Sequence, residues 1–350
     1  MSSSPQVLFL GSGVDVPTTR YRILPFLPHL RERGARCDLA LSYPEKYGSF
    51  DLIGWRASQW LKRAVRHWHR VRAAWRRYDA IVIEREIFDN PTWDLERRFR
   101  GTTPRLILDV DDAIFLRYPE KFAAIAGMCD TVVAGNPLLA EKAAEFCRDV
   151  VVIPTCVELD DYRLHDGTQV TGPPVIGWIG TPSNIPYLRQ VAGPLRRLRE
   201  RLPFQLRIVT DVEAARKEAG WEDLTALGAE WRPWTAGGAA AEIAEFDVGI
   251  MPLPDEEWAR YKCGFKLLQY MASGVAPVGS PVGVNRTILE DGVSGCLPIG
   301  DEAWFAALHG LLESPERRQA MGTAARARAA ECYAVRGHVD RWWHTLFPTS

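Results

Sequence analysis

The sequence lacks the features that mark several large classes of protein. It has no uninterrupted apolar run near the roughly 18 residues that a membrane span requires. Its first residues, MSSSPQVLFLGSG, lack the basic start and the long apolar stretch of a signal peptide. It also contains no internal repeat and no low-complexity segment. We therefore expect a globular protein that works in the cytoplasm.

Cysteine pattern and net charge exclude two further classes. The seven cysteines are scattered, include no C-x-x-C pair and are odd in number. A disulfide framework or a zinc site is therefore not expected, whereas a reducing cytoplasm is. The formal net charge of -1 argues against nucleic acid as the main partner, because phosphate backbones attract an excess of Lys and Arg.

The chain does have the length and the strand pattern of a two-domain α/β protein. Its 350 residues exceed the roughly 150 of an ordinary domain. In the first half, helical stretches separate the apolar runs VLFLGSG, RCDLALS, DAIVIER, RLILDVDD, TVVAG and DVVVIPT. Such runs predict a parallel sheet covered on both faces. The first helix is expected over TTRYRILPFLPHLRERG, with Thr18 or Thr19 as its cap and Gly34 at its end.

The pattern restarts after ELDDYRLHDGTQVTGPP, a polar, turn-rich stretch that we interpret as a linker. Strands are expected at VIGWIGTP, FQLRIVT, AEWRPW, DVGIMPL and APVGS. The predicted fold class is α/β, with two Rossmann-like doubly wound domains over residues 1–160 and 174–335. A C-terminal helix, residues 336–350, is expected to cross back to the first domain. Because ligands of such sheets bind at the carboxyl ends of the strands, we expect a central cleft faced by both domains.

The segment YKCGFKLLQYMASGVAPVGSPVG has helical apolar spacing but opens with two lysines around a glycine. A helix N-terminus offers unpaired N–H groups and a partial positive charge, which suit a phosphate group. Gly264 would let the backbone approach such a group, while Lys262 and Lys266 would add charge. Gln269 lies three residues after Lys266 and hence on nearly the same face. The alternative is a core helix with solvated lysines, and the spacing alone leaves both open.

The run from DVGIMPL to LEDGVSG resembles the donor-binding half of GT-B glycosyltransferases, in particular family four of the retaining enzymes, the group one glycosyl transferases. Weaker similarity extends over both halves, including GSGVDVPTTRYRILPFLPHLRERG. The resemblance implies a GT-B fold whose second domain binds a nucleotide-diphosphate sugar. The family has two glutamates across this strand end and helix, where this chain has Tyr261 and Gln269. We expect Gln269 to keep the second glutamate's contact with the donor ribose, because an amide also hydrogen-bonds a diol.

The resemblance also assigns the rest of the donor side. The family often has an arginine and a lysine just after the strand that ends in GWIGTPSN; both are missing here, so Lys262 and Lys266 are the candidates to replace them. The donor-binding residues implied in all are Gly180, Thr181, Arg232, Trp234, Lys262, Gly264, Lys266, Gln269, Gly283, Val284, Asn285 and Glu290. Structural alternatives stay open: Trp234 in the core, a plain turn at residues 283–285, and a solvated helix end at Glu290.

Two strand ends of the first half carry charged residues. LILDVDDAIF places Asp109, Asp111 and Asp112 at one strand end, and IVIEREIF places Arg85 and Glu86 at another. Aspartate clusters can bind manganese, as in the other glycosyltransferase fold, but that fold has a single sheet domain. We therefore expect no metal and interpret Asp111, Asp112 and Glu86 as facing the acceptor or the sugar, with helix capping as the alternative. The acceptor-side residues are Gly13, Arg20 and Arg85.

The stretch RASQWLKRAVRHWHRVRAAWRRY has eight Lys and Arg residues and no Asp or Glu. One apolar helical stripe is made of Leu61, Ala64, Val65, Trp68, Val71 (or Arg72), Trp75 and Tyr78. Such a stripe indicates a helix that packs on its own sheet and turns its basic residues to solvent. The alternative is that residues 56–77 rest on an anionic membrane, as a peripheral contact at its inner face.

The sequence as a whole predicts a retaining, metal-independent glycosyltransferase without a further cofactor. It would move a sugar from a nucleotide-diphosphate sugar to a hydroxyl of a cell-surface polysaccharide or lipid-linked sugar precursor. The catalytic candidates are Lys266, Lys262, Asp111, Asp112 and Glu86, with the lysines aimed at the charge that develops on the leaving phosphate. Two alternatives stay open, namely a GT-B sugar-nucleotide epimerase or hydrolase, and a non-catalytic subunit that binds the nucleotide sugar.

Overall fold

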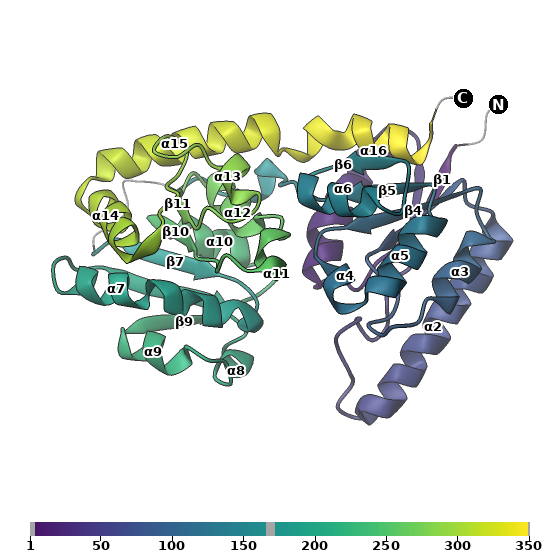
Figure 1. Ribbon diagram of the computed structural model, residues 1–350, viewed down its shortest axis with the longest axis horizontal. Helices are drawn as coiled ribbons and strands as arrows, with labels where there is room; N and C mark the ends of the chain where they lie inside the picture. Colours follow the sequence, from purple (N-terminus) through teal and green to yellow (C-terminus); the bar gives the residue numbers. More distant parts are fainter. Residues whose placement is uncertain (1–3, 166–171, 349–350) are drawn as a thin grey trace. The chain divides into compact units, whose positions relative to one another are not determined.

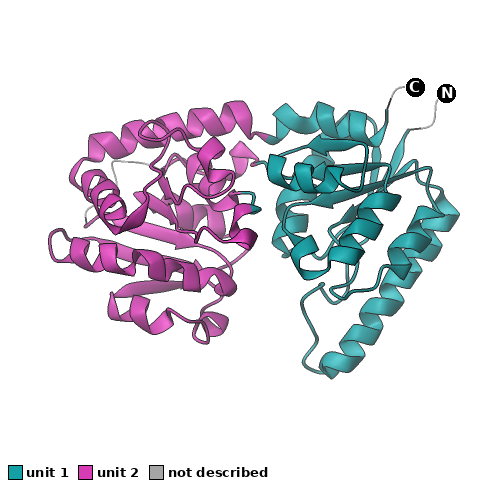
Figure 2. Ribbon diagram, viewed as in Figure 1, with its two compact units in different colours: residues 1–156, 261–263, 335–350 teal, residues 157–260, 264–334 magenta. Residues whose placement is uncertain are grey.

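The computed structural model describes residues 4–165 and 172–348 (Figure 1). The chain divides into two compact units, shown in Figure 2. Unit 1 comprises Met1–Cys156, Tyr261–Cys263 and Val335–Ser350, and unit 2 comprises Val157–Arg260 and Gly264–Ala334. Residues 166–171, which belong to the predicted linker, lie outside the described residues.

Unit 1 is built on a parallel sheet of six strands, at the positions that the sequence predicted. The strands, in sheet order, are β2 (Arg36–Leu39), β1 (Gln6–Leu10), β3 (Ala80–Glu84), β4 (Arg105–Val110), β5 (Thr131–Ala134) and β6 (Val150–Val152). Both faces of β3 are covered, because all its residues are buried. The chain order reverses between β1 and β3, which is where doubly wound sheets bind their ligands, beyond the carboxyl ends of the strands.

Helices cover both faces of this sheet. They are η1 (a π-helix, Thr19–Ile23), α1 (Phe26–Glu32), α2 (Gly54–Arg76), α3 (Asp94–Arg100), α4 (Ile114–Arg117), α5 (Pro119–Met128), α6 (Pro137–Ala144), η4 (a 3-10 helix, Val335–His338) and α16 (Val339–Leu346). The prediction of one continuous first helix was wrong, because Pro25 cannot donate a helical hydrogen bond and α1 restarts after it. Thr18 makes no capping bond with its side chain.

The orientation of α2 is the reverse of the one that the sequence predicted. Its buried residues are Ser58, Lys62, Arg66 and Ala73. The tryptophans of the predicted inward stripe face solvent instead, with Trp68 64% and Trp75 91% exposed. Tyr78, just after the helix, is the member of the stripe that is fully buried.

Backbone carbonyl groups near the carboxyl ends of β1 and β2 account for this reversal. Arg66 donates hydrogen bonds of 2.7 Å to the carbonyl oxygens of Gly11 and Ala40, one residue beyond each strand. Lys62 Nζ donates to the carbonyl oxygen of Lys46 at 2.6 Å. Buried carbonyl groups need donors, and the long stems of Lys and Arg reach them from under a helix. The basic residues therefore occupy the inner face of α2, and the tryptophans are left on the outer one.

The C-terminal segment packs into the core of unit 1 through one aromatic residue. The ring of Trp342, on α16, lies 6.2 Å from that of Phe9 and 5.9 Å from that of Phe26, centroid to centroid. Arg105 adds a hydrogen bond of 2.6 Å from Nε to the carbonyl oxygen of Thr345. Residues 335–350 thus complete unit 1, although they follow the whole of unit 2 in the chain.

Unit 2 is built on a parallel sheet of five strands. In sheet order they are β11 (Ala276–Gly279), β10 (Val248–Met251), β7 (Val175–Ile179), β8 (Gln205–Thr210) and β9 (Ala229–Pro233). The helices are η2 (Leu159–Asp161), η3 (Pro182–Val191), α7 (Ala192–Arg199), α8 (Val212–Ala215), α9 (Trp221–Ala226), α10 (Ala239–Ala244), α11 (Glu257–Arg260), α12 (Phe265–Ala272), α13 (Asn285–Ile288), α14 (Gly300–Glu313) and α15 (Pro315–Cys332). Here the chain order reverses between β7 and β10, which makes the ends of these strands the expected ligand site of unit 2.

None of the helices in residues 4–165 and 172–348 combines the length and the apolar character that a bilayer span requires. All seven cysteines are free thiols.

The inward position of Arg66 leads to the first testable prediction. Arg66→Ala should lower the free energy of unfolding by about 2–4 kcal/mol, because two charge-assisted hydrogen bonds and a buried side chain are lost. Arg63→Ala, on the exposed side of the same helix, should change it by no more than about 0.5 kcal/mol. Urea unfolding of both variants checks the difference. Equal effects would mean that α2 does not pack through its basic face.

Candidate functional site

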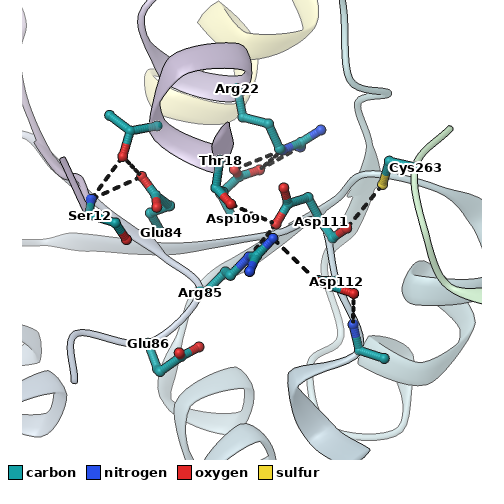
Figure 3. Close-up of polar contacts among 12 residues, drawn as sticks. Ser12, Thr18, Arg22, Glu84, Arg85, Glu86, Asp109, Asp111, Asp112 and Cys263 are labelled. Carbon is teal, nitrogen blue, oxygen red and sulfur yellow. Dashed lines mark hydrogen bonds and ion pairs between the residues drawn. The ribbon is translucent and has the colours of Figure 1, made fainter. Parts of the chain in front are cut away.

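Two arginine–aspartate pairs hold the end of β4 in unit 1 (Figure 3). Arg22, on η1, donates from Nε to both carboxylate oxygens of Asp109 at 3.1 and 2.9 Å, and both side chains are buried. The same guanidinium bonds the carbonyl oxygen of Ile153 at 3.0 Å. One side chain therefore ties η1, β4 and the segment after β6 together.

Arg85 forms the second pair, just beyond β3. Its φ of 54° lies in the left-handed region, which a non-glycine residue seldom adopts. The Nε atom donates to Asp111, and one terminal nitrogen lies 3.6 Å from an oxygen of Asp112. Strained backbone of this kind is retained where the surroundings fix the side chain. The structure thus brings together Arg85, Asp111 and Asp112, which the sequence had placed on two strand ends.

The two aspartates differ in acidity. Burial alone would raise the pKa of Asp111, but the Arg85 guanidinium outweighs it and holds that pKa below its usual value. Burial raises the pKa of Asp112, and the charges of Arg85 and Lys262 offset this only in part. A carboxylate with a raised pKa is the better proton acceptor. Asp112 is therefore the stronger candidate of the two for a general base.

Two glutamates near the end of β3 each keep one buried oxygen without a partner among the described residues. Glu84 accepts hydrogen bonds from the hydroxyl of Thr19 and from the backbone N–H of Ser12 through Oε2, and its Oε1 is the unpaired atom. Glu86 pairs with Lys46 through Oε1 at 2.6 Å, which leaves Oε2. Figure 3 shows Glu86 apart from the Arg85 cluster. The structure thus separates Glu86 from the two aspartates with which the sequence grouped it.

The other acceptor-side candidates lie in the loop after β1 and on η1. Gly13 has no room for a side chain, because a Cβ atom would stand 2.4 Å from the carboxylate of Glu45. Arg20 is about a quarter exposed and lies 3.6 Å from Asp15. Both positions are near the reversal between β1 and β3.

The short segment Tyr261–Cys263 belongs to unit 1. The Tyr261 carbonyl accepts a hydrogen bond of 2.8 Å from the Asn136 side chain, and the Cys263 thiol donates to the Asp111 carbonyl at 3.3 Å. Burial raises the pKa of the Cys263 thiol to about 12, so it stays protonated. Lys262 lies between these anchors and acts on the charge of Asp112.

The carboxylates at the strand ends of unit 1 are not arranged as metal ligands. Within residues 4–165 and 172–348, no group of three or more His, Cys, Asp and Glu side chains has the arrangement that a metal ion needs. Asp109 and Asp111 are each engaged by an arginine instead. The aspartate cluster of LILDVDDAIF therefore reads as a set of ion pairs.

In unit 2, a tyrosine hydroxyl marks the point where β7 and β10 separate. These strands pair only through Val248 and Gly249 of β10. Farther along, the Tyr270 hydroxyl accepts from the N–H of Ile179 at 3.3 Å and donates to the carbonyl of Ile250 at 3.1 Å. Because Tyr270 is on α12, this contact fixes α12 against the reversal point of the sheet.

Lys266 lies one helical turn before Tyr270 and is brought to the end of β7. Its Nζ stands 5.4 Å from the centre of the Trp178 ring, a cation–π contact. A Cβ atom at Gly180 would lie 2.5 Å from Lys266 Cε and 2.8 Å from the Trp178 ring. Glycine at position 180 thus leaves the space that the lysine stem occupies.

The glycine before α12 is held in a crowded turn. Gly264 has a φ of 66°, and a Cβ atom there would stand 3.0 Å from Asn285 Oδ1 and closer still to Ile288. Gly283 also has positive φ and packs against the backbone of Arg260. The structure therefore brings Gly264 and Asn285 into contact. Asn285, however, donates its side-chain amide to the Ser280 carbonyl at 2.9 Å and is buried.

Gln269 is 5% exposed and donates from Nε2 to the Tyr162 hydroxyl at 3.3 Å. Its amide therefore has a partner inside the protein. This contact gives Gln269 a structural role, in addition to the ribose contact that the sequence predicts.

The remaining donor-side candidates are more dispersed. Thr181 follows Gly180, and its hydroxyl accepts from Asn184 at 2.6 Å. Arg232 pairs with Glu230 at 2.6 Å near the end of β9, and Trp234 packs half-buried against the core. Val284 is buried, whereas Glu290 is exposed in a hollow of about 620 Å³ that Arg286 and Arg328 also line.

Sequence reasoning missed several residues that build these sites. They are Arg22, Glu84, Asn136, Trp178 and Tyr270. Asn136 had a usable signal, since Asn before Pro137 is typical of a capped helix start, and its side chain does accept from the N–H of Leu139. The others gave none, because their roles depend on which residues the fold brings opposite them.

Solved structures with this fold cover nearly the whole chain. HepE from Anabaena, solved with UDP and glucose, has a TM-score of 0.70 at 14% identity over 98% of this chain and 99% of its own. Sucrose-phosphate synthase from Thermosynechococcus elongatus has a TM-score of 0.74 at 14% identity, over 99% and 100%. A glycosyltransferase from Rickettsia africae ESF-5 gives 0.72 at 13% identity, over 99% and 100%. At identities this low, the structural similarity shows the fold alone. It confirms the predicted GT-B architecture.

A family match supplies the activity class. Residues 173–314 match the family of glycosyl transferases group 1. The chain has the GT-B fold, and its second half carries a domain of the group 1 glycosyl transferases. The match falls on unit 2, where the sequence located the resemblance, and so confirms it. A comparison with curated proteins gave no match.

The Arg85 cluster of unit 1 gives a second prediction. Arg85→Met should cost about 3–5 kcal/mol of unfolding free energy at pH 7, because two mostly buried carboxylates lose their counter-charge. Without Arg85, burial raises the pKa of Asp111, so the folded state protonates it as the pH falls. The loss should therefore shrink between pH 7 and pH 5, whereas wild-type Asp111, with its lowered pKa, still stabilises the fold there.

Urea unfolding at both pH values measures this effect. Arg117→Met serves as the control, because Arg117 pairs with Asp89 but is 58% exposed, and such pairs contribute only about 0–1 kcal/mol. An equal loss at both pH values would show that Arg85 stabilises the unit by packing alone.

Proposed function

We propose that the glycosyltransferase moves a sugar from a nucleotide-diphosphate sugar to a hydroxyl group, with retention at the anomeric carbon and without a metal ion. The observation that carries the proposal is the position of Lys266 at the end of β7, over Trp178 and against Gly180. A fixed cation beside a glycine turn, at the reversal of a doubly wound sheet, suits a diphosphate. HepE was solved with UDP-glucose, which supports a donor of this class.

The chemistry assigned to unit 2 is charge stabilisation. Breaking the glycosidic bond of the donor leaves negative charge on the β-phosphate. Lys266 and the N–H groups at the start of α12 and η3 would hold that charge without reorganising, which is how such groups accelerate transfer. Lys262 would add charge from the segment Tyr261–Cys263. A retained configuration follows from the family resemblance and is part of the proposal.

Unit 1 is assigned the acceptor. Its strand ends offer Asp112, a carboxylate whose pKa is raised by burial and whose side chain is still 18% exposed. Glu86 follows the neighbouring strand but is buried. Carboxylates that accept hydrogen bonds suit the hydroxyl groups of a sugar, which fits a polysaccharide or lipid-linked sugar precursor as acceptor. Asp112 would take the proton of the attacking hydroxyl as its oxygen bonds to the anomeric carbon. The cytoplasmic location expected from the sequence stays a prediction.

A substitution of Lys266 tests the proposal directly. Lys266→Ala should lower the rate of nucleoside diphosphate release by about a hundred- to a thousand-fold, since one donor to a developing oxyanion contributes about 2.7–4 kcal/mol. The assay combines labelled nucleotide sugars with a glycolipid and polysaccharide extract. Lys217→Ala, on an exposed lysine of the same unit, is the control. Wild-type turnover in the Lys266 variant would show that Lys266 does not stabilise the leaving phosphate. Turnover by the wild-type protein without any acceptor would indicate an epimerase or hydrolase.

Gln269 distinguishes a ribose contact from a structural amide. If it binds the ribose, Gln269→Ala should weaken nucleotide diphosphate binding by about 2-fold to 150-fold, and Gln269→Glu should retain binding. If its role is the hydrogen bond to Tyr162, the alanine variant should lose stability and bind as wild type. Calorimetry together with thermal unfolding separates the two outcomes.

Independence from metal is tested with a chelator. Because Asp109 and Asp111 are engaged by arginines, transfer should continue unchanged in an excess of EDTA. Activity that is lost and then restored by manganese would refute this part of the proposal.

A further inference from the structure

The outer face of α2 is an apolar surface that the core of unit 1 does not use. Trp60, Trp68 and Trp75 are 74%, 64% and 91% exposed, and Val71 lies between them on the same side. Their spacing of three, four and eight residues keeps them on one helical stripe. Leu52, Ile53 and Trp55, at the start of the helix and in the turn before it, are also exposed. In Figure 1 this end of α2 points away from the sheet.

The basic residues of α2 fall into two groups. Lys62, Arg66 and Arg72 bond backbone carbonyl groups of unit 1, and Arg76 pairs with Asp38. A second group recurs at every seventh position, which places its members in one row beside the tryptophan stripe. These are Arg56, Arg63 and Arg70; Arg77 has the same spacing but lies beyond the helix in a left-handed conformation. Within the described part of the chain, the guanidinium groups of this second group make no hydrogen bond or ion pair.

We propose that this face of α2, the tryptophan stripe with its arginine row, binds the surface of an anionic membrane. Tryptophan prefers the boundary between lipid headgroups and acyl chains, where its ring is buried and its N–H stays hydrated. Each Lys or Arg near an anionic surface adds attraction, and no Asp or Glu on α2 opposes it. The combination matches a helix that lies in the plane of the membrane.

This surface differs from the one that the sequence suggested. The sequence pointed to the basic face as a whole, yet Lys62, Arg66 and Arg72 bond carbonyl groups within unit 1. The surface proposed here is the tryptophan stripe, of which the sequence had assigned Trp68, Val71 and Trp75 to the core, together with the arginine row. A second copy of the chain is a poorer occupant, since pairing through α2 would bring two surfaces of the same sign together.

The proposed membrane binding does not depend on the proposed sugar transfer. Only its purpose, access to a lipid-linked acceptor, rests on that function. The test uses the full chain with vesicles of phosphatidylcholine, alone or mixed equally with phosphatidylglycerol. Wild type should sediment with the mixed vesicles only, with a blue shift of tryptophan emission, and should dissociate as salt screens the charges.

Two sets of variants test the surface. Trp60→Ser/Trp68→Ser/Trp75→Ser should abolish binding and the blue shift. Arg56→Glu/Arg63→Glu should lower the partition coefficient at least about tenfold. Ile299→Ser and Arg148→Glu/Arg196→Glu, which change exposed residues elsewhere, should bind as wild type. Thermal unfolding should be unaltered in all of them, because none of these side chains is buried.

Nucleotide diphosphate binding, measured by calorimetry on the same variants, separates this proposal from the proposed function. Unchanged nucleotide binding with lost vesicle binding supports the membrane surface. Failure of wild type to bind the mixed vesicles at low salt, or equal losses in the control variants, would overturn it. A wild-type dimer that the tryptophan variant converts to a monomer would overturn it in favour of a second copy.

Discussion

The ion pair between Arg22 and Asp109 is the constraint on which unit 1 depends. A parallel sheet gathers the carboxyl ends of its strands at one edge, and in unit 1 that edge carries several carboxylates. Asp109 is fully buried there, so it needs a cation within reach. Arg22 supplies it and at the same time joins η1 to the end of β6. With the charge of Asp109 balanced, Arg85 is left to hold Asp111 and Asp112, the carboxylates that we propose face the acceptor.

Buried carbonyl groups at the same edge of the sheet also bind cations, and this determines which residues of α2 face solvent. Lys62 and Arg66 are drawn inward by backbone carbonyl groups beyond β1 and β2, and the tryptophans of α2 are displaced outward as a consequence. Unit 2 uses a cation differently. Tyr270 fixes α12 at the separation of β7 and β10, and Lys266 then stands over Trp178 at the site where a diphosphate would bind.

Local patterns were sufficient for the strands and for the family resemblance. Near-continuous apolar runs such as DAIVIER are compatible with few structures other than a buried strand. The turn at Gly264 requires glycine, because its φ is positive and a Cβ atom would meet Asn285. The apolar stripe of α2 led to a wrong prediction of the buried face of this helix, because periodicity shows which residues share a face but not which face is inside. Burying Arg66 requires carbonyl partners from Gly11 and Ala40, which are distant in the sequence. Gln269 was placed correctly on a helix, whereas Asn285, predicted in a turn, begins α13. The internal partners of both residues depend on tertiary contacts that spacing rules do not contain.

Thermal unfolding with a panel of nucleotide-diphosphate sugars tests the central claim, that unit 2 binds such a donor through Lys266 and Gly180. A matching donor at about 100 times its dissociation constant should stabilise the protein by roughly 2.7 kcal/mol. Gly180→Ala should remove that shift, because the added methyl group takes the space of the lysine stem. A panel in which no nucleotide sugar raises the unfolding temperature, or one in which Gly180→Ala responds as wild type, would contradict the account.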